Sequence, residues 1–450
     1  MLKHRFHFES TLPFPSDDVF SWHLREGALE RLVPPWINAR VVKHGSPKQV
    51  GSKTILRFGF GPFHTDWVAE HTHFVPGKEF ADKERKGPFR FWHHIHKVED
   101  LPSGSLLEDD IEYALPFFLS NAQIKQQLHR QFAWRHKRVL YDLTTFSLYE
   151  KTTKKILVSG SRGLVGSSLC AFLTAAGHEV WHLQRDPSNA SAKIIGWDPQ
   201  QDGKNGKEFE GFDAVVHLAG ENIGNKRWSP KHKEKIFRSR CRDTWLLSHI
   251  LSRLKNPPKV FLSASAIGIY GDRGSEVLTE ESSYGSDFLA DVCIHWEKAS
   301  EILNEVGIRR CLLRFGYVLS PKGGMLRPMI PLFRLGLGGK LGSGKQIMPW
   351  IALDDVIYAI YHCIMKEEIQ GPVNVVAPSP VKQVEFARTL AKALRSTAFA
   401  RVPTWFLKMV LGEKADALIF RSANAEPTKL LKSGFTFCYR ELKSYLKESL

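Results

Sequence analysis

The sequence has few cysteines for its length, and none of them forms a recognisable metal or disulfide motif. Six cysteines are spread over 450 residues without a CxxC pair, so neither a zinc site nor a disulfide framework is indicated. No run reaches the roughly 18 apolar residues that a membrane-spanning helix needs. No apolar signal core follows the basic residues at the N-terminus. These absences favour a reduced, cytoplasmic protein with no membrane span.

The composition is that of a folded protein with excess positive charge. Hydrophobic residues make up 43% and charged residues 24% of the chain, and the formal net charge is +16. The length corresponds to about three domains of roughly 150 residues each. The positive charge favours anionic partners, but the basic residues are scattered and no aromatic-rich nucleic-acid motif accompanies them. Nucleic acid is therefore disfavoured as a partner.

The first 148 residues follow the element order of an α+β domain. A strand pattern at 6–12 precedes a helical pattern at 16–32. Strand-like runs follow at 39–43, 53–60, 65–74, 89–98 and 106–113, and a long helical pattern closes the segment at 121–141. This order resembles the START-like, helix-grip (SRPBCC) superfamily, in which a curved sheet grips a helix. The resemblance implies an apolar cavity that binds a hydrophobic ligand; the alternative is a core filled by side chains.

A glycine-rich turn marks the start of a second domain at about residue 154. Gly160, Gly163 and Gly166 come directly after a short apolar strand and open a helical pattern that runs to Ala176. Another strand follows at 179–183, so the segment reads as a βαβ unit. In such a turn the glycines permit a sharp bend, close approach to a pyrophosphate and tight helix packing. The helix N-terminus then faces the phosphates, and we expect a bound dinucleotide.

The end of the second strand of this unit indicates which dinucleotide binds. An NAD site places an acidic residue there to hold the ribose 2′-hydroxyl, whereas this sequence has Gln184 and Arg185. Arg162, inside the glycine turn, is a second cation. Two guanidinium groups suit a 2′-phosphate, which an aspartate would repel. NADP(H) is therefore expected in preference to NAD(H), although Asp186 follows at once and both arginines could be solvated loop residues.

Strands and helices continue to alternate up to about residue 396. Strand-like runs at 214–218, 260–263 and 310–314 are separated by helical stretches at 231–254 and 289–305. This alternation predicts an α/β fold, a Rossmann-type doubly wound parallel sheet. We therefore expect three domains: a START-like α+β domain at 1–148, a dinucleotide-binding domain at 154–396, and a small helical domain at 397–450.

Several segments of the second domain resemble the extended short-chain dehydrogenase/reductase superfamily, and within it the NAD-dependent epimerase/dehydratase branch. The segments include His217-Leu-Ala-Gly-Glu-Asn-Ile, Ser263-Ala-Ser-Ala-Ile-Gly-Ile-Tyr-Gly and Leu313-Arg-Phe-Gly-Tyr-Val-Leu-Ser. The last 54 residues resemble the small C-terminal domain of unknown function that the epimerase family carries. The resemblance implies a bound dinucleotide and a small-molecule substrate whose identity the sequence leaves open.

The resemblance also assigns cofactor-binding positions. The glycine turn, with Gly160, Gly163, Leu164, Val165 and Gly166, would hold the pyrophosphate. Arg162 and Arg185 would lie at the 2′-phosphate. The residues His217, Leu218 and Ala219 would line the adenosine, and Gly316 would approach the nicotinamide ribose.

The catalytic pair of the superfamily is missing from this chain. Ordinary members carry Tyr-x-x-x-Lys on one helix face, where the lysine lowers the tyrosine pKa for proton transfer. In the expected helix, Cys293 stands in place of the tyrosine and Glu297 in place of the lysine. Ser265 is the nearest candidate for the partner hydroxyl. A relay of Ser265 with Cys293 or Glu297 is one hypothesis; the other is that Cys293 is a small buried residue and Glu297 caps a surface.

Two functions remain open at this point. The first is an atypical NADP(H)-dependent oxidoreductase or epimerase fused to a domain for an apolar ligand. The second is a non-catalytic sensor that binds a dinucleotide and a lipid-like ligand, in which the missing Tyr-x-x-x-Lys pair reflects lost catalysis.

Overall fold

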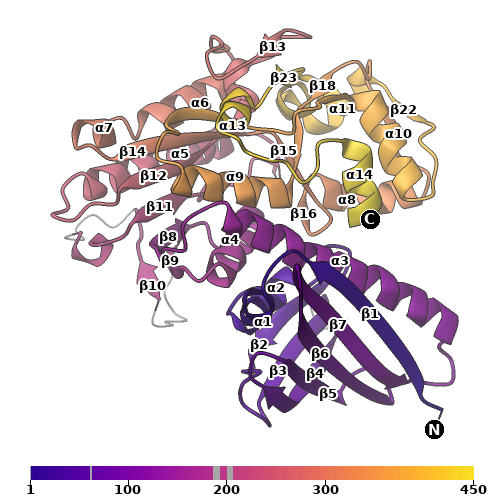
Figure 1. Cartoon of the computed structure of the whole chain (residues 1–450). Helices are drawn as coiled ribbons and strands as arrows, with labels where there is room; N and C mark the ends of the chain where they lie inside the picture. Colours follow the sequence, from indigo (N-terminus) through magenta and orange to yellow (C-terminus); the bar gives the residue numbers. More distant parts are fainter. Residues whose placement is uncertain (1, 61–62, 186–192, 200–205, 225) are drawn as a thin grey trace. The chain divides into compact units, whose positions relative to one another are not determined.

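The computed structural model describes residues 2–60, 63–185, 193–199, 206–224 and 226–450. The chain divides into two compact units (Figure 1). The N-terminal unit comprises residues 1–152 together with 171–177, and the second unit comprises residues 153–170 and 178–450. Each unit is described by itself.

The N-terminal unit is built on one antiparallel sheet of seven strands in the order β1-β7-β6-β5-β4-β3-β2. The strands are β1 (His4–Leu12), β2 (Ala39–Lys43), β3 (Lys53–Phe60), β4 (Phe63–Val75), β5 (Glu79–Lys86), β6 (Phe91–Leu101) and β7 (Gly104–Ala114). The helices are α1 (Ser16–Leu24), α2 (Ala28–Arg31) and α3 (Asn121–Ser147). Strand β1 pairs with β7, so the first strand of this unit lies beside the last strand of the unit.

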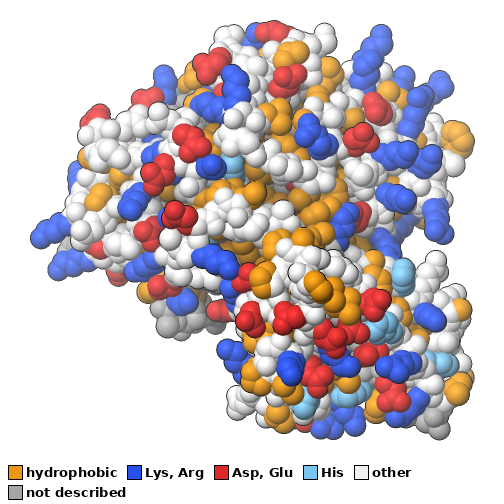
Figure 2. Space-filling view, viewed as in Figure 1, with side chains coloured by type: hydrophobic (Ala, Val, Ile, Leu, Met, Phe, Trp, Pro, Cys, Tyr) orange, Lys and Arg blue, Asp and Glu red, His pale blue; other side chains and the backbone are white. Residues whose placement is uncertain are grey.

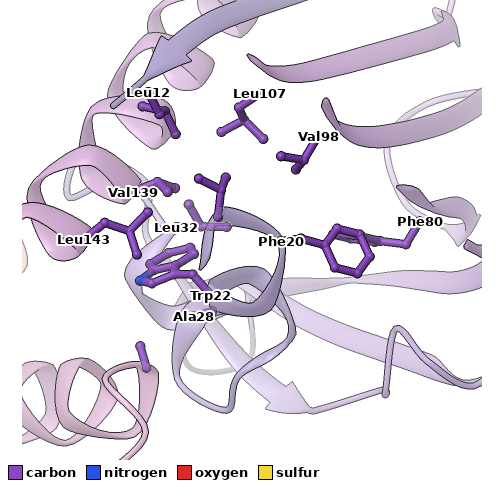
Figure 3. Close-up of a cluster of buried hydrophobic side chains, with 12 residues drawn as sticks. Leu12, Phe20, Trp22, Ala28, Leu32, Phe80, Val98, Leu107, Val139 and Leu143 are labelled. Atoms are coloured by element: carbon purple, nitrogen blue, oxygen red, sulfur yellow. The ribbon is translucent and has the colours of Figure 1, made fainter. Parts of the chain in front are cut away.

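One face of this sheet is covered by helix side chains. Figure 3 shows Val139 and Leu143 of α3 gathered with Leu12 and Leu107 of the sheet, and Trp22 of α1 below them. Further along α3, the rings of Phe132 and Phe6 lie 5.6 Å apart between centroids, within a second buried cluster. Apolar side chains therefore fill much of the space between α3 and the sheet, and the expected apolar-ligand cavity stays a prediction.

The second unit contains a parallel sheet of seven strands in the order β10-β9-β8-β11-β12-β14-β20. Its strands are β8 (Lys155–Ser159), β9 (Glu179–Gln184), β10 (Ile194–Gly196), β11 (Ala214–His217), β12 (Val260–Ala266), β14 (Arg309–Phe315) and β20 (Gly371–Val375). The order reverses between β8 and β11, and Rossmann-type sheets bind their ligands at the carboxyl ends of the strands at such a point. The predicted Rossmann-type α/β fold is confirmed.

Helices lie between these parallel strands and after the last of them. They are α4 (Leu164–Ala175), α5 (Pro230–Leu251), α6 (Phe288–Lys298), α7 (Ile302–Glu305), α8 (Leu326–Arg334), α9 (Leu353–Met365), α10 (Gln383–Ala393), α11 (Thr404–Leu411), α12 (Glu413–Ala415), α13 (Thr428–Lys432) and α14 (Leu442–Ser449). The residues of α4 from Ala171 on belong to the N-terminal unit. Short helical turns lie at Lys207–Phe209, Ile267–Tyr270 and Asp416–Phe420. Leu157, Val215 and Phe261 of three neighbouring strands pack with Leu247 and Leu251 of α5 in a buried cluster.

Short strands outside the parallel sheet complete the second unit. They are β13 (Val277–Leu278), β15 (Tyr317–Ser320), β16 (Gly323–Gly324), β17 (Gly339–Leu341), β18 (Ile347–Met348), β19 (Trp350–Ala352), β21 (Val381–Lys382), β22 (Ala400–Val402) and β23 (Asn424–Ala425). Strand β22 pairs with β17, and β23 pairs with β13. The last 50 residues therefore contribute to the same compact unit as the parallel sheet.

The charged side chains on the surface are mixed in sign, and most of the cysteine side chains are buried. Figure 2 shows Lys and Arg side chains dispersed among acidic ones on the visible face. None of the six cysteines, which all lie in the described residues, forms a disulfide, and five of them are buried. Within the described part of the chain, no helix combines the length and the apolar character needed to cross a bilayer.

Candidate functional site

The glycine turn between β8 and α4 closes tightly on the end of β11. Gly160 has φ +68°, a left-handed conformation that favours glycine. A Cβ at Gly160 would lie 2.8 Å from the carbonyl carbon of Leu218. A Cβ at Gly166 would meet the carbonyl oxygen of Gly160, so α4 packs directly against the turn. The structure thus brings these glycines to the switch point of the sheet, where the sequence predicts a pyrophosphate.

The other residues of the turn lie around the start of α4. Gly163 and Arg162 are exposed, and Leu164 and Val165 are half-buried in the first turn of the helix. The amide of Gly163 donates to the carbonyl oxygen of Gly160 at 2.9 Å. The N-terminus of α4 therefore adjoins the exposed glycine, as an anion site at a helix start requires.

Ser159 fixes the neighbouring strand end. Its Oγ lies 2.7 Å from Nδ1 of His217 and accepts hydrogen bonds from the amides of Leu218 and Ala219 at 3.1 and 3.3 Å. His217 is fully buried and stacks on Phe261. Burial lowers the pKa of His217 to about 4, so the ring is neutral at pH 7. The imidazole faces the interior of the sheet, which leaves Leu218 and Ala219 as the predicted adenosine contacts nearest the turn.

Arg185 follows β9 directly and is largely exposed. Its Nη2 lies 3.2 Å from Oδ2 of Asp243 on α5. Burial raises the pKa of Asp243, and the nearby Arg185 opposes that rise. Asp243 therefore orients the Arg185 guanidinium while leaving most of it accessible. Asp186, the acidic residue that could oppose a 2′-phosphate, lies outside the described residues.

Gly316 links β14 to β15, where added side-chain atoms would clash. A Cβ there would lie 2.8 Å from Cγ1 of Val376, and its amide donates to the carbonyl oxygen of Val375 at 3.1 Å. The residue thus keeps the backbone close beside β20. Its contact with a nicotinamide ribose stays a prediction.

Ser265 and Glu297, two of the three candidate catalytic residues, are joined by a hydrogen bond. The Ser265 hydroxyl at the end of β12 donates to Oε1 of Glu297 on α6 at 2.7 Å. Glu297 is buried, so it does not cap a surface. Arg314 of β14 binds both oxygens of this carboxylate, each at 2.9 Å. The two acid–base candidates therefore share their site with a permanent cation.

Arg314 extends this network to a buried tyrosine. Its Nη1 donates to the Tyr270 hydroxyl at 2.9 Å, and that hydroxyl donates to Oδ1 of Asn374 at 2.6 Å. Burial disfavours the charged form of Arg314, but the bonds to Glu297 outweigh it and raise the pKa of Arg314 above its usual value. The carboxylate therefore has a fully charged partner at all ordinary pH values.

Cys293, the third candidate, lies one helical turn before Glu297. Its side chain is buried in a cluster with Ile267, Ile269 and Tyr270. Burial and the nearby Glu297 raise the pKa of Cys293 to about 12. The group is a thiol at pH 7, and a thiol is a poor nucleophile and a poor base.

Arg314 is a site residue that was not predicted from the sequence, although the sequence carries one signal for it. Arg314 interrupts an apolar strand, Cys311-Leu-Leu-Arg-Phe. A charged residue inside a buried parallel strand requires a buried partner. That rule identifies Arg314 as part of an interior pair but does not identify Glu297 as its partner, because the two elements meet only in the folded sheet.

The fold and the glycine turn define a Rossmann-type nucleotide-binding protein. The sequence model of the NAD dependent epimerase/dehydratase family matches residues 156–376, and that of a domain of unknown function, DUF1731, matches residues 402–449. An epimerase family protein of Mycobacterium bovis is 38% identical over 283 residues, which cover 63% of this chain and 93% of the relative.

Two solved structures extend the likeness. A nucleoside-diphosphate sugar epimerase from Corynebacterium glutamicum is 32% identical with a TM-score of 0.83, and the match covers 99% of this chain and 90% of the other. The human epimerase family protein SDR39U1, solved with NADPH, is 31% identical with a TM-score of 0.61. That match covers 65% of this chain and 98% of the human one. The chain belongs to the NAD dependent epimerase/dehydratase family.

Proposed function

We propose that the protein is an NADP(H)-dependent oxidoreductase or epimerase that acts on a small molecule. The observation that carries the proposal is the glycine turn, whose Gly160 approaches Leu218 at the switch point of the sheet. The human relative with bound NADPH supports the choice of cofactor. A bound dinucleotide supplies hydride transfer, and the residues of this chain bind it and manage the proton.

The preference for NADP(H) rests on Arg162 and Arg185. Both guanidinium groups follow carboxyl ends of neighbouring strands, β8 and β9, which pair in parallel. Arg185 is held by Asp243 at 3.2 Å and stays largely exposed. Guanidinium groups bind phosphate bidentately, so both would favour a ribose that carries a 2′-phosphate.

Calorimetric titration of the full-length protein with NADPH and NADH tests this preference. We expect NADPH to bind more tightly, and Arg185→Ala to weaken NADPH by roughly 1.5–3 kcal/mol, the range for a hydrogen bond to a charged group. NADH affinity should not change. Arg253→Ala, an exposed arginine just beyond α5, is the matched control. Equal affinities for the two nucleotides, unchanged in Arg185→Ala, would refute the preference.

The proton step is proposed to pass through Ser265, with Glu297 as its acceptor. Their 2.7 Å hydrogen bond aligns the hydroxyl with a carboxylate, and Cys293 is a buried thiol beside them. General acid–base catalysis contributes roughly 10²–10⁴-fold to a rate. In a screen of carbonyl compounds and nucleotide sugars followed by NADPH absorbance, Ser265→Ala should lose that factor in kcat and keep NADPH affinity. Cys293→Ala should keep both.

The bidentate Arg314 pair favours a second candidate function, a non-catalytic sensor. Both oxygens of Glu297 are already engaged by Arg314 at 2.9 Å, which limits how well the carboxylate can accept a further proton. In this alternative the protein binds the dinucleotide without turnover. Ser265→Ala with an unchanged rate on a reactive substrate would contradict the relay, whereas tight NADPH binding without any reactive substrate would favour the sensor.

We infer that the N-terminal unit is a START-like, helix-grip domain that binds a hydrophobic ligand. The inference is supported by its element order and by a group of aromatic rings. The half-buried Trp67 lies 6.1 Å from Phe58, 5.6 Å from Phe89 and 5.1 Å from the buried Trp92 between centroids. Binding of a fluorescent fatty-acid analogue to the full-length protein tests it. We expect saturable binding that Trp67→Arg abolishes; no saturable binding would favour a filled core. The cytoplasmic location stays a prediction from the sequence.

A further inference from the structure

The sheet of the N-terminal unit carries a row of titratable side chains across three adjacent strands. The register pairs His71 of β4 with Asp82 of β5, and Asp82 with His94 of β6. Directly paired residues in an antiparallel sheet point to the same face. His94 is buried, with 4% of its side chain exposed, and Asp82 is half-buried, with 14% exposed. This row therefore lies on the largely covered face of the sheet.

A second row lies beside the first. His96 of β6 pairs with Asp109 of β7, two residues along from the first row on the same face. Asp109 is buried and contacts three imidazoles: Nε2 of His94 at 2.8 Å, Nδ1 of His96 at 2.6 Å and, from α3, Nε2 of His136 at 2.6 Å. The contact with His96 has poor hydrogen-bond alignment, and the other two are hydrogen bonds.

These contacts favour particular ring tautomers. Asp109 presents both of its oxygens to the ring nitrogens, and an ionised carboxylate only accepts hydrogen bonds. The hydrogen bond to Asp109 places a proton on Nε2 of His94, and the 2.6 Å contact favours a proton on Nδ1 of His96. In these tautomers Nδ1 of His94 and Nε2 of His96 each offer a lone pair.

Both of those lone-pair nitrogens face the same carboxylate oxygen. Oδ2 of Asp82 lies 3.6 Å from Nδ1 of His94 and 3.9 Å from Nε2 of His96. Each of the three residues offers one ligand atom, and these atoms all lie within 4.8 Å of one another. Three acceptor atoms converge there, and such an arrangement is favourable only when a proton or a metal cation lies among them.

We propose that Asp82, His94 and His96 bind a divalent first-row transition-metal ion. Two imidazole nitrogens and one carboxylate oxygen on one side of an ion form a three-residue set that zinc and iron(II) sites use, with further coordination positions left open. Ligands about 2.1 Å from an ion lie at most about 4.2 Å apart, so the three groups close by a fraction of an ångström around it.

The surroundings of the three residues match those of a metal site. Metal-binding histidines commonly donate their second ring N–H to a carboxylate, which sets the tautomer and the ring orientation. Asp109 occupies that position for His94 through a hydrogen bond at 2.8 Å, and it lies 2.6 Å from the second ring nitrogen of His96. His71 lies across from Asp82 with its Nδ1 buried and without a hydrogen bond among the described residues, so a fourth nitrogen stands next to the set.

A second carboxylate–histidine group of this unit lacks these features. His7, Glu9 and Glu108 also place three ligand atoms within 4.8 Å, but two of these residues are exposed. His7 already uses Nε2 towards Glu9 at 3.1 Å and Nδ1 towards Asp110 at 3.2 Å. This group has its own internal partners and serves as a control.

The test uses the full-length protein without a histidine tag, stripped with a chelator and titrated with Zn²⁺ or Co²⁺. Equilibrium dialysis with metal analysis should find one tightly bound ion per chain, and Co²⁺ should give the absorption of a nitrogen-ligated site. His94→Gln and His96→Gln should each lose the tight ion. The control variants His93→Gln and His7→Gln should keep the tight ion. His93 is next to His94 on β6 and lies on the opposite face of that strand.

Asp82→Asn guards against misreading a folding defect. The Asn side chain keeps the size of Asp82 and removes the charge that faces His94 and His96, so the melting temperatures of the metal-free variant and the metal-free wild type are compared first. Zn²⁺ should raise the melting temperature of the wild type, since a ligand that binds only the folded state stabilises it, and this rise should be absent in Asp82→Asn. The proposal is overturned if the wild type retains no tight ion, if His94→Gln and His96→Gln retain it, or if Zn²⁺ stabilises Asp82→Asn equally.

Discussion

The two units bury charged groups in different ways. In the Rossmann-type unit, the Glu297 carboxylate meets the permanent cation of Arg314 through two contacts of 2.9 Å. In the N-terminal unit, Asp82 and Asp109 meet imidazoles, whose charge depends on pH and whose nitrogens can also bind metals. The first arrangement is complete within the chain. The second leaves a carboxylate and two lone pairs directed at one point, which a further cation would complete.

The largest expected effect comes from breaking the complete pair. Arg314→Met would leave Glu297 buried and unpaired, and breaking a buried pair on one side typically costs about 3–5 kcal/mol. Urea unfolding of the full-length protein, followed by circular dichroism, should report this loss. The double variant Arg314→Met/Glu297→Leu should recover most of it, since replacing both partners of such a pair with apolar residues is often neutral. A single variant as stable as the wild type would contradict the pairing argument.

His217 is a buried imidazole without a nearby acid. It therefore shows what burial alone does to the stability of a histidine. Burial lowers its pKa to about 4 in the folded state, against roughly 6.5 when unfolded. The unfolded chain therefore binds the proton first, and stability falls as the pH drops from about 6.5 to 4. The shift corresponds to about 3 kcal/mol. Calorimetric unfolding across this range should show a weaker pH dependence for His217→Gln than for the wild type.

A smaller effect is expected from Asp109, which supports the proposed metal ligands without touching the ion. Asp109→Asn would remove the charged acceptor that sets the tautomers of His94 and His96. Losing such a supporting carboxylate weakens metal affinity by roughly 10–100-fold. Zn²⁺ competition with a chromophoric chelator measures the change. An unchanged Zn²⁺ affinity would mean that Asp109 stabilises the core of the unit and does not support the metal site.

The sequence predicted those features that depend on neighbouring residues. The strand–glycine–helix order placed a helix at 164–176, and α4 spans Leu164–Ala175. It also predicted a long helix from residue 121, which α3 confirms and extends to Ser147. Period and turn chemistry determine these elements locally, so no tertiary information is needed to find them.

The two buried networks depend on long-range pairing and could not be predicted in that way. Asp82 pairs with His71 only because the β4–β5 register shifts between His71 and His73. A slip of one residue would turn Asp82 to the other face of the sheet. Glu297 likewise meets Arg314 only because α6 packs on β12, which lies beside β14 in the sheet. Such contacts follow from strand order and bulges, which local patterns do not encode.

The smallest expected effect comes from the exposed counterpart of the buried histidines. The hydrogen bond to Glu9 raises the pKa of His7 despite some burial. A raised pKa means that its stabilising contribution is fully present below about pH 6.5 and is lost as the pH rises through the folded value. The His7 side chain is 41% exposed, so solvent screening keeps this contribution below about 1 kcal/mol. His7→Gln should therefore lower the free energy of unfolding slightly at pH 6 and not at pH 8.5. The effect is small because water screens this exposed pair, whereas the buried imidazoles interact with carboxylates in a medium of low dielectric constant. An equal loss at both pH values would assign the effect to packing.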